Sequence, residues 1–415
     1  MVKTEHVTQN PKPYIRVIDS MMGSGKSNYI INDINDYPER RYIYVGKYLD
    51  ETQRIVNNCQ NAHFKQPSED RFGSKQADFH CLLKNGANMA VTHELFKRLE
   101  FSAREQELIQ DMKYRLILDE VPEVIEVISV SNHDRKEILE RYAVVDDDGF
   151  LVWKVDDYKG NHGELKRQIK SKAVIDYEKA YFLWLFPIEL LLSFKQVDVL
   201  TFLFDGSHMK SYLEIHHLKH DTFHIRERKL TPGKQDLYHE LSKVHGLIHI
   251  YEGDLNEVGE QTNALSSTWW KNNIKVKGRV VERHALNILQ NRHKAHAKVS
   301  MWTRFKIEKQ GNPILNGLRF VESFVPCNAC AANVHDKRKY FAYLVNIYEN
   351  PIVVNWFKAH GINVNEEIYA LSQSVQWIWR SAVRKGNEIH LYIPSSRMRG
   401  LLTAFLNGNH DAMAA

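Results

Sequence analysis

Short, almost wholly apolar segments alternate with amphipathic segments in the first part of the chain. The apolar runs that predict strands are residues 14–18, 41–45, 88–92 and 115–119. Segments with helical spacing follow the first three runs, at 28–34, 49–58 and 93–99. Strands that are apolar on both faces and alternate with helices indicate a parallel sheet covered on both sides. The pattern therefore predicts an α/β fold.

This alternation weakens and then returns further along the chain. Residues 134–172 are strongly charged and predict an insertion on a solvated face, whereas 196–204 predict another buried strand. A polar, histidine-rich stretch at about 214–295 is expected to hold the junction between two domains. In the second half, strands are predicted at 299–303, 319–325 and 388–393, and helices at 340–348, 353–359 and 372–384. Both halves thus have α/β character.

Composition narrows the class of protein without naming a function. The 415 residues are 43% hydrophobic and 26% charged, which is typical of a globular protein of about two to four domains. Disorder, a collagen-like repeat and a coiled-coil rod are excluded as descriptions of the whole chain. The net charge of +5, from 56 basic and 51 acidic residues, is too small to establish nucleic-acid binding. No apolar run reaches the length of a membrane span, so no membrane partner is expected.

Cysteines and histidines are the candidate metal ligands of this sequence. Four cysteines in so long a chain do not make a disulfide scaffold, so we expect a reducing cytoplasm. Cys327 and Cys330, with His335 nearby, supply three ligands, but a structural zinc needs four and no second pair follows. The histidines between 216 and 224 also lack a complete ligand set. We interpret both groups as structural or surface residues.

A glycine-rich segment between the first strand and the first helix carries the sharpest chemical signal. Its predicted nucleotide-binding residues are Ser20, Gly23, Ser24, Gly25, Lys26 and Ser27. Glycines let successive backbone N–H groups turn inward on phosphate oxygens, and the following helix adds its positive end. Lys26 is expected to reach the β- and γ-phosphates of ATP, and the Ser27 hydroxyl to bind Mg²⁺.

An acidic pair at the end of another apolar run supplies the second half of such a site. Asp119 is predicted to hold Mg²⁺, and Glu120 to orient or deprotonate the attacking water. The alternative is that the two residues cap a helix, as aspartate often does. The glycine loop in the same α/β domain favours the catalytic interpretation, and with it the hydrolysis of ATP.

These two motifs resemble those of superfamily 2 helicases, in particular compact DEAD/DEAH-like helicases encoded by bacteriophages. The family's first motif ends in Gly-x-Gly-Lys-Thr/Ser and its second begins Asp-Glu, as at 23–27 and 119–120 here. The resemblance implies two RecA-like P-loop lobes with parallel sheets and inserted segments, and with ATP in the cleft between the lobes. We expect the lobes at 1–225, with the insertion at about 134–172, and at 226–415.

The resemblance also implies positions that contact nucleic acid. Lys47 and Tyr48 lie in a segment similar to one that touches the nucleic-acid backbone in these helicases, and Thr92 and His93 lie in a second. Arg304 follows the predicted first strand of the second lobe. By themselves, the first two segments read as ordinary strand-to-helix turns. Residues 205–207 stand where the family's coupling motif falls, although their letters do not match it.

A further segment resembles the family's sixth motif, which supplies an arginine finger. On one predicted helix, Gln376, Arg380 and Arg384 fall at i, i+4 and i+8 and share a face. Such a face can reach a γ-phosphate, with Arg380 favoured as the finger and Arg384 second. The alternative is a solvated basic face. The neighbouring Trp377 and Trp379 are predicted to be core residues.

The function expected is ATP-dependent helicase or translocase activity on nucleic acid, with DNA favoured and RNA as the other partner. One alternative is a DNA-packaging motor of the terminase type, although no acidic triad of a nuclease follows residue 300. The other is a P-loop scaffold or switch that binds nucleotide without moving on DNA. Translocation polarity and oligomeric state are not readable from the sequence.

Overall fold

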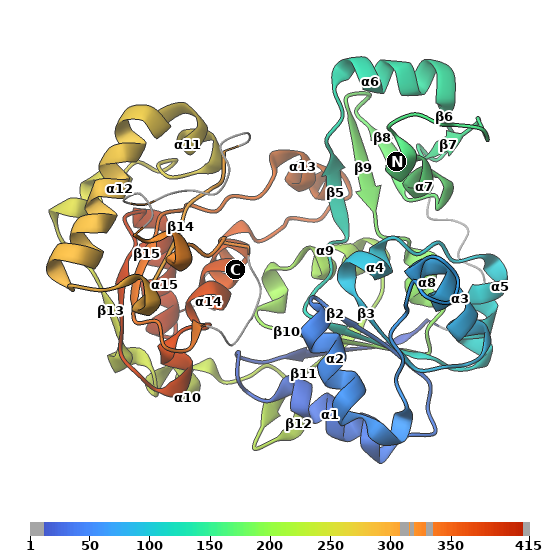
Figure 1. Cartoon of the computed structure of the whole chain (residues 1–415), viewed down its shortest axis with the longest axis horizontal. Coiled ribbons are helices and arrows are strands. Elements are labelled where there is room, and N and C mark those ends of the chain that lie inside the picture. The colour runs from blue at the N-terminus through green and yellow to red at the C-terminus, as the bar shows by residue number, and fades with distance from the viewer. Residues whose placement is uncertain (1–11, 308–314, 316–318, 329–334, 410–415) are drawn as a thin grey trace. The chain divides into compact units, whose positions relative to one another are not determined.

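The computed structural model describes residues 12–307, 315, 319–328 and 335–409. This part of the chain divides into two compact units (Figure 1). The first unit comprises the residues up to Ser20, then Ser24–Gln235 and Asn350–Val364, and the second comprises Met21–Gly23, Asp236–Glu349 and the residues from Asn365 on. The main division thus falls ten residues after the expected one, because the strand Lys229–Pro232 also joins the first unit's sheet.

A seven-stranded sheet forms the centre of the first unit, in the order β12-β11-β1-β10-β4-β2-β3. Its strands are β1 (Tyr14–Asp19), β2 (Tyr42–Gly46), β3 (Met89–Thr92), β4 (Arg115–Asp119), β10 (Gln196–Thr201), β11 (His220–Arg226) and β12 (Lys229–Pro232). All neighbours are parallel except β11 and β12, which form an antiparallel pair. The predicted parallel α/β sheet is therefore confirmed for this unit.

Helices cover both faces of this sheet because its strands are apolar on both sides. The helices on one face are α1 (Lys26–Asp36) and α2 (Leu49–Asn58), and those on the other include α3 (Lys75–Lys84), α4 (His93–Lys97), α5 (Ala103–Asp111), α8 (Ile188–Leu192) and α9 (His208–Ile215). Along β4, Ile117 packs into the cluster with α1 and α2, whereas Leu116 and Leu118 pack into the opposite cluster. This alternation is the two-residue period of a strand.

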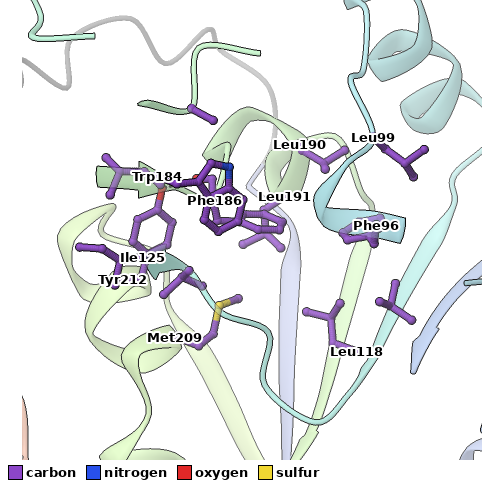
Figure 2. Packing of buried hydrophobic residues seen from close by; sticks show 14 of the residues in the cluster. Phe96, Leu99, Leu118, Ile125, Trp184, Phe186, Leu190, Leu191, Met209 and Tyr212 are labelled. Atoms are coloured by element: carbon purple, nitrogen blue, oxygen red, sulfur yellow. Dashed lines mark hydrogen bonds between the residues drawn. The ribbon is translucent and has the colours of Figure 1, made fainter. Parts of the chain in front are cut away.

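An inserted layer separates β4 from β10 along the chain. It contains an antiparallel sheet of β5 (Ile125–Ile128), β9 (Tyr181–Leu185) and β8 (Val174–Tyr177), a hairpin of β6 (Ala143–Val145) and β7 (Leu151–Trp153), and the helices α6 (Asn132–Glu137) and α7 (Gly163–Lys170). Figure 2 shows how it joins the main core: Trp184 and Phe186 lie beside Leu191 of α8. The charged segment 134–172 forms only part of this layer, whose β5, β8 and β9 lie outside it.

The second unit is built on a four-stranded parallel sheet. Its strands, in spatial order, are β13 (Ile248–Ile250), β16 (Ile389–Tyr392), β15 (Tyr340–Tyr343) and β14 (Ser300–Thr303). Its helices are α10 (Leu237–Ser242), α11 (Ser267–Asn273), α12 (Arg279–Leu286), α14 (Glu366–Ile378) and α15 (Ser396–Leu406). The expected α/β character of the second half is confirmed.

Two element predictions in this unit were wrong. Residues 340–348, predicted as a helix, begin with the central strand β15, whose Ala342 packs with α11 and α12 while Phe341 contacts Trp377 of α14. An apolar run buried on both faces has no periodicity that separates strand from helix. Residues 319–325, predicted as a strand, form a turn and a 3₁₀ segment at Val321–Ser323, with one bridge from Phe324 to Trp302.

Helix α13 (Pro351–Ala359) belongs to the first unit although it comes late in the chain. Asn350 caps it by accepting a hydrogen bond from the Ile352 N–H at 3.0 Å, and proline stands at its start. Its apolar face, including Trp356 and Phe357, is buried in the first unit's core. The chain therefore leaves the second unit, anchors in the first and returns.

We expect Trp356→Ala to lower the free energy of unfolding by about 3–5 kcal/mol, the cost of truncating a fully packed aromatic residue. The matched control Asn355→Ala, on the exposed face of the same helix, should stay within about 0.5 kcal/mol. Urea unfolding measures both. Hydrogen exchange should show the loss of protection in β5, which α13 contacts; loss confined to the second unit would contradict this packing.

Candidate functional site

Five parallel strands of the first unit end at one edge of the sheet, in the order β1, β10, β4, β2 and β3. Ligands of open α/β sheets bind outside the carboxyl ends of the strands. The glycine loop follows β1, Asp119 ends β4, Lys47 follows β2 and Thr92 ends β3. Strand order therefore brings together four segments that are well separated in the sequence.

The glycine loop has the backbone that a phosphate-binding turn needs. Gly23 and Gly25 have φ angles of 86° and 95°, a region that residues with a Cβ rarely adopt. Helix α1 starts directly after Gly25, with no acidic residue in its first turn and no side-chain cap. Lys26 donates to the carbonyl oxygen of Ser20, and Ser24 Oγ is buried without a hydrogen-bond partner among the described residues. These features fit a polyphosphate, because the helix end offers uncapped N–H groups and positive potential.

Asp119 is the most constrained acid of this edge. Its carboxylate accepts hydrogen bonds from the Tyr44 hydroxyl and, at 3.3 Å, from the Ser27 hydroxyl. Burial raises the pKa of Asp119, and the hydrogen bond from Tyr44 counters part of that rise. Ser27 and Asp119 thus place two oxygen ligands side by side, which is the donor type that Mg²⁺ prefers.

Glu120 follows in a strained backbone conformation. Its φ is 68°, unusual for a residue other than glycine, and its N–H donates to the Leu200 carbonyl of β10 at 3.0 Å. Its Oε2 lies 3.7 Å from Nζ of Lys47, and both side chains are partly exposed. Strain of this kind clusters at functional sites.

Glu51 is a third carboxyl group at this edge, and the motif analysis missed it. Its Oε2 accepts from the backbone N–H of Lys47 at 2.9 Å and of Tyr48 at 3.2 Å, which fixes the start of α2. Burial, followed by repulsion from Asp119 and Glu120, raises the pKa of Glu51 to about 7. The spacing of Glu51, three residues after the helix cap Tyr48, was the available signal, since a capping box places an acid there.

The remaining predicted nucleic-acid residues of this unit have structural contacts as well. Thr92 caps α4 by accepting from the Leu95 N–H, and Tyr48 is 36% exposed at the start of α2. Nε2 of His93 lies 2.9 Å from the carbonyl oxygen of Asp119. Burial lowers the pKa of His93, and the hydrogen bond to the Asp119 carbonyl counters part of that fall. His93 therefore positions the acidic pair.

Asp19, at the end of β1, is a second residue that the sequence did not single out. Its carboxylate accepts from the N–H groups of Leu203 and Phe204, both at 2.9 Å. These donors begin the segment that holds 205–207, and Leu203 has a left-handed backbone with φ of 57°. Burial raises the pKa of Asp19. The carboxylate thus joins the strand before the glycine loop to the loop after β10.

The predicted shared face of Gln376, Arg380 and Arg384 is not present. Helix α14 ends at Ile378, and a separate 3₁₀ helix, η11 (Ala382–Lys385), carries Arg384. Gln376 donates to Ser372 within α14. Arg380 is 6% exposed, and its Nε and Nη1 have no partner among the described residues, whereas Arg384 is exposed. The expected one-helix geometry was therefore wrong, because the chain turns after Ile378.

Arg304, Trp377 and Trp379 are buried residues of the second unit. Arg304 is 8% exposed, its Nε lies 3.0 Å from a Glu282 carboxylate oxygen, and its guanidinium stacks on the Trp270 ring. These contacts give Arg304 a structural role in the fold of the second unit. Trp377 and Trp379 are buried, which confirms their predicted core role.

The part of the chain that the structure describes shows neither a metal-ligand cluster nor a candidate membrane span. No group of three or more histidine, cysteine or acidic side chains within it could hold a metal ion. Cys330, half of the cysteine pair, lies outside the described residues. No helix within the described ranges is long and apolar enough to cross a membrane.

The raised pKa of Glu51 predicts a pH-dependent stability. The folded state binds this proton more tightly than the unfolded chain, so stability falls as pH rises from the ordinary value of 4.5 to about 7. Glu51→Gln keeps an oxygen acceptor but no charge, and should raise the free energy of unfolding by about 1–3 kcal/mol near pH 8. Near pH 5 the gain should vanish. Urea unfolding at both pH values checks this, and the exposed control Glu123→Gln should show no such difference; an equal gain at both pH values would contradict the assignment.

Comparisons with known proteins place the chain in a family. A family model described as the YonV C-terminal Rossmann-like domain matches residues 242–406. Solved structures described as "XPD_APO" and "Structure of S. tokodaii Xpd4" match with 13% and 10% identity and TM-scores of 0.47 and 0.46; the alignments cover 94% and 95% of this chain and 95% and 94% of theirs. The SPbeta prophage-derived uncharacterized protein YonV of Bacillus subtilis (strain 168) is 34% identical over 415 residues, covering 94% of this chain and 98% of that protein. This similarity extends over nearly the full length of both, and the chain belongs to the YonV family.

Proposed function

We propose that the chain is an ATP-dependent helicase or translocase that acts on nucleic acid, with DNA as the favoured substrate. The observation that carries this proposal is the meeting, at one edge of one sheet, of the glycine loop, the Asp119–Glu120 pair and the segments after β2 and β3. Side chains of the proposed nucleotide site thus contact the segments that are proposed to bind nucleic acid. The prophage origin of the relative supports the expected bacteriophage type.

Each residue of the edge has a distinct role in the proposed hydrolysis. Lys26 and the N–H groups at the start of α1 bind the β- and γ-phosphates of ATP. Ser27 and Asp119 would hold Mg²⁺, which supplies positive charge to the phosphate oxygens. Glu120 orients the attacking water and accepts its proton.

The proposed nucleic-acid contacts on this unit are ionic and aromatic. Lys47 offers an ammonium to a backbone phosphate, and the exposed ring of Tyr48 offers a stacking surface for a base. Thr92 adds a hydroxyl at the neighbouring strand end. His93 acts through the Asp119 carbonyl, and the ion pair with Glu282 holds Arg304.

Of the two arginines, we propose Arg384 as the one that stabilises the charge developing on the γ-phosphate. Its side chain is exposed on η11, whereas Arg380 is buried. This reverses the preference drawn from the motif spacing alone. Arg380 is then a residue of the second unit's interior.

Lys26→Ala should lower ATP turnover by about 100-fold or more, since it removes a charged donor aimed at the transferred phosphate. The exposed control Arg104→Ala on α5 should keep the wild-type rate. The assay is steady-state ATP hydrolysis with and without single-stranded DNA, followed by strand separation on forked DNA and RNA. Turnover indifferent to nucleic acid would favour the nucleotide switch, and dependence on duplex DNA without strand separation would favour a packaging motor.

Arg384→Ala should reduce nucleic-acid-stimulated hydrolysis on the order of 1,000-fold while nucleotide affinity changes little, because a finger acts on the transition state. The matched variant Arg380→Lys keeps the buried charge and should retain most of the rate. Single-turnover hydrolysis and fluorescent-nucleotide binding measure the two effects. Loss of turnover in Arg380→Lys with full activity in Arg384→Ala would restore the motif-based preference.

A further inference from the structure

The ion pair between Lys47 and Glu120 joins two parts of the site that have different proposed partners. Lys47 belongs to the segment after β2 that is proposed to contact nucleic acid, and Glu120, the proposed base, directly follows the neighbouring strand β4. Nζ of Lys47 lies 3.7 Å from Oε2 of Glu120. The lysine side chain is 37% exposed and the glutamate side chain 29%, so solvent and ligands reach both.

Both backbones are held firmly, which confines any movement to the two side chains. The Lys47 N–H donates to Glu51, and a Cβ on the preceding Gly46 would lie only 3.0 Å from the Tyr44 ring, a tight contact. Glu120 is held by its hydrogen bond to Leu200. The contact therefore depends on rotamers of Lys47 and Glu120, which change easily at an exposed site.

We propose that Lys47 restrains Glu120 until a nucleic-acid phosphate takes its ammonium. This inference rests on the proposed function and describes how nucleic acid regulates the hydrolysis. In the free protein the ammonium competes with the attacking water for the Glu120 carboxylate. A backbone phosphate is an equally good partner for the ammonium, and binding it leaves Glu120 free to orient water. Lys47 is thus a positioning residue for hydrolysis as well as a contact to the nucleic acid.

Thermodynamic reciprocity gives the proposal a consequence that does not involve hydrolysis. If the phosphate and Glu120 compete for Lys47, removing the Glu120 charge must strengthen nucleic-acid binding. The factor equals the one by which nucleic-acid binding weakens the Lys47–Glu120 ion pair. The effect must disappear when Lys47 is absent. A general reduction of negative charge would instead strengthen binding whether or not Lys47 is present.

The first test is ATP hydrolysis by the full chain with and without oligothymidylate. Lys47→Gln should raise the rate without DNA about two- to fivefold, the size of one partly exposed ion pair, and bring the stimulation ratio close to one. Lys75→Gln, an exposed lysine in the first turn of α3, should change neither. An unchanged rate without DNA, or a loss of both rates, would overturn the proposal, because the lysine would then be a simple contact or a structural charge.

The second test is the affinity for fluorescent oligothymidylate, measured without ATP in a double-mutant cycle. Glu120→Gln should bind about two- to fivefold more tightly than wild type, and should bind no more tightly in the Lys47→Gln background. Equal gains in both backgrounds would overturn the restraint. A wild-type chain that neither binds oligothymidylate nor responds to it would refute the proposed function itself; stimulated hydrolysis without coupling would refute only this inference.

Discussion

The carboxylate of Asp119 is the charge around which the first unit's functional edge is organised. An ionised group at the end of a buried strand is costly unless donors meet it. Tyr44 reaches it from β2 and Ser27 from α1, while His93 binds its backbone carbonyl from α4. Three segments with separate predicted roles therefore contact one residue. A displacement of any of them would change the contacts of the acidic pair.

Strand order makes this organisation possible. Because β10 lies between β1 and β4, both neighbours make contacts at this end of β10: Asp19 accepts two N–H groups of the loop after β10, and the Glu120 N–H donates to Leu200 of β10 itself. The segment at 205–207 sits in this loop. Its letters do not match the coupling motif of the resembled helicases, yet it directly follows Leu203 and Phe204, whose N–H groups Asp19 binds.

The inserted layer and α13 extend the same core. Trp184 of β9, Phe96 of α4 and Trp356 of α13 lie in one cluster of buried residues with the sheet (Figure 2 shows the first two). An insertion that shares a core with its host sheet resists independent motion, since separating them exposes large aromatic surfaces. The anchoring of α13 adds two further chain crossings between the units.

The sequence by itself determined the features that depend on neighbours along the chain. The buried strands predicted for the first unit, the glycine loop and an acidic pair at a strand end are local patterns, and the structure has each where it was predicted. Tertiary structure alone decided the rest. Glu51 lies near Asp119 only because β2 pairs with β4. The strand at 340–343 was mistaken for a helix because burial on both faces erases periodicity. Arg380 and Arg384 do not share a helix because α14 ends at Ile378, and spacing along the sequence does not encode that end.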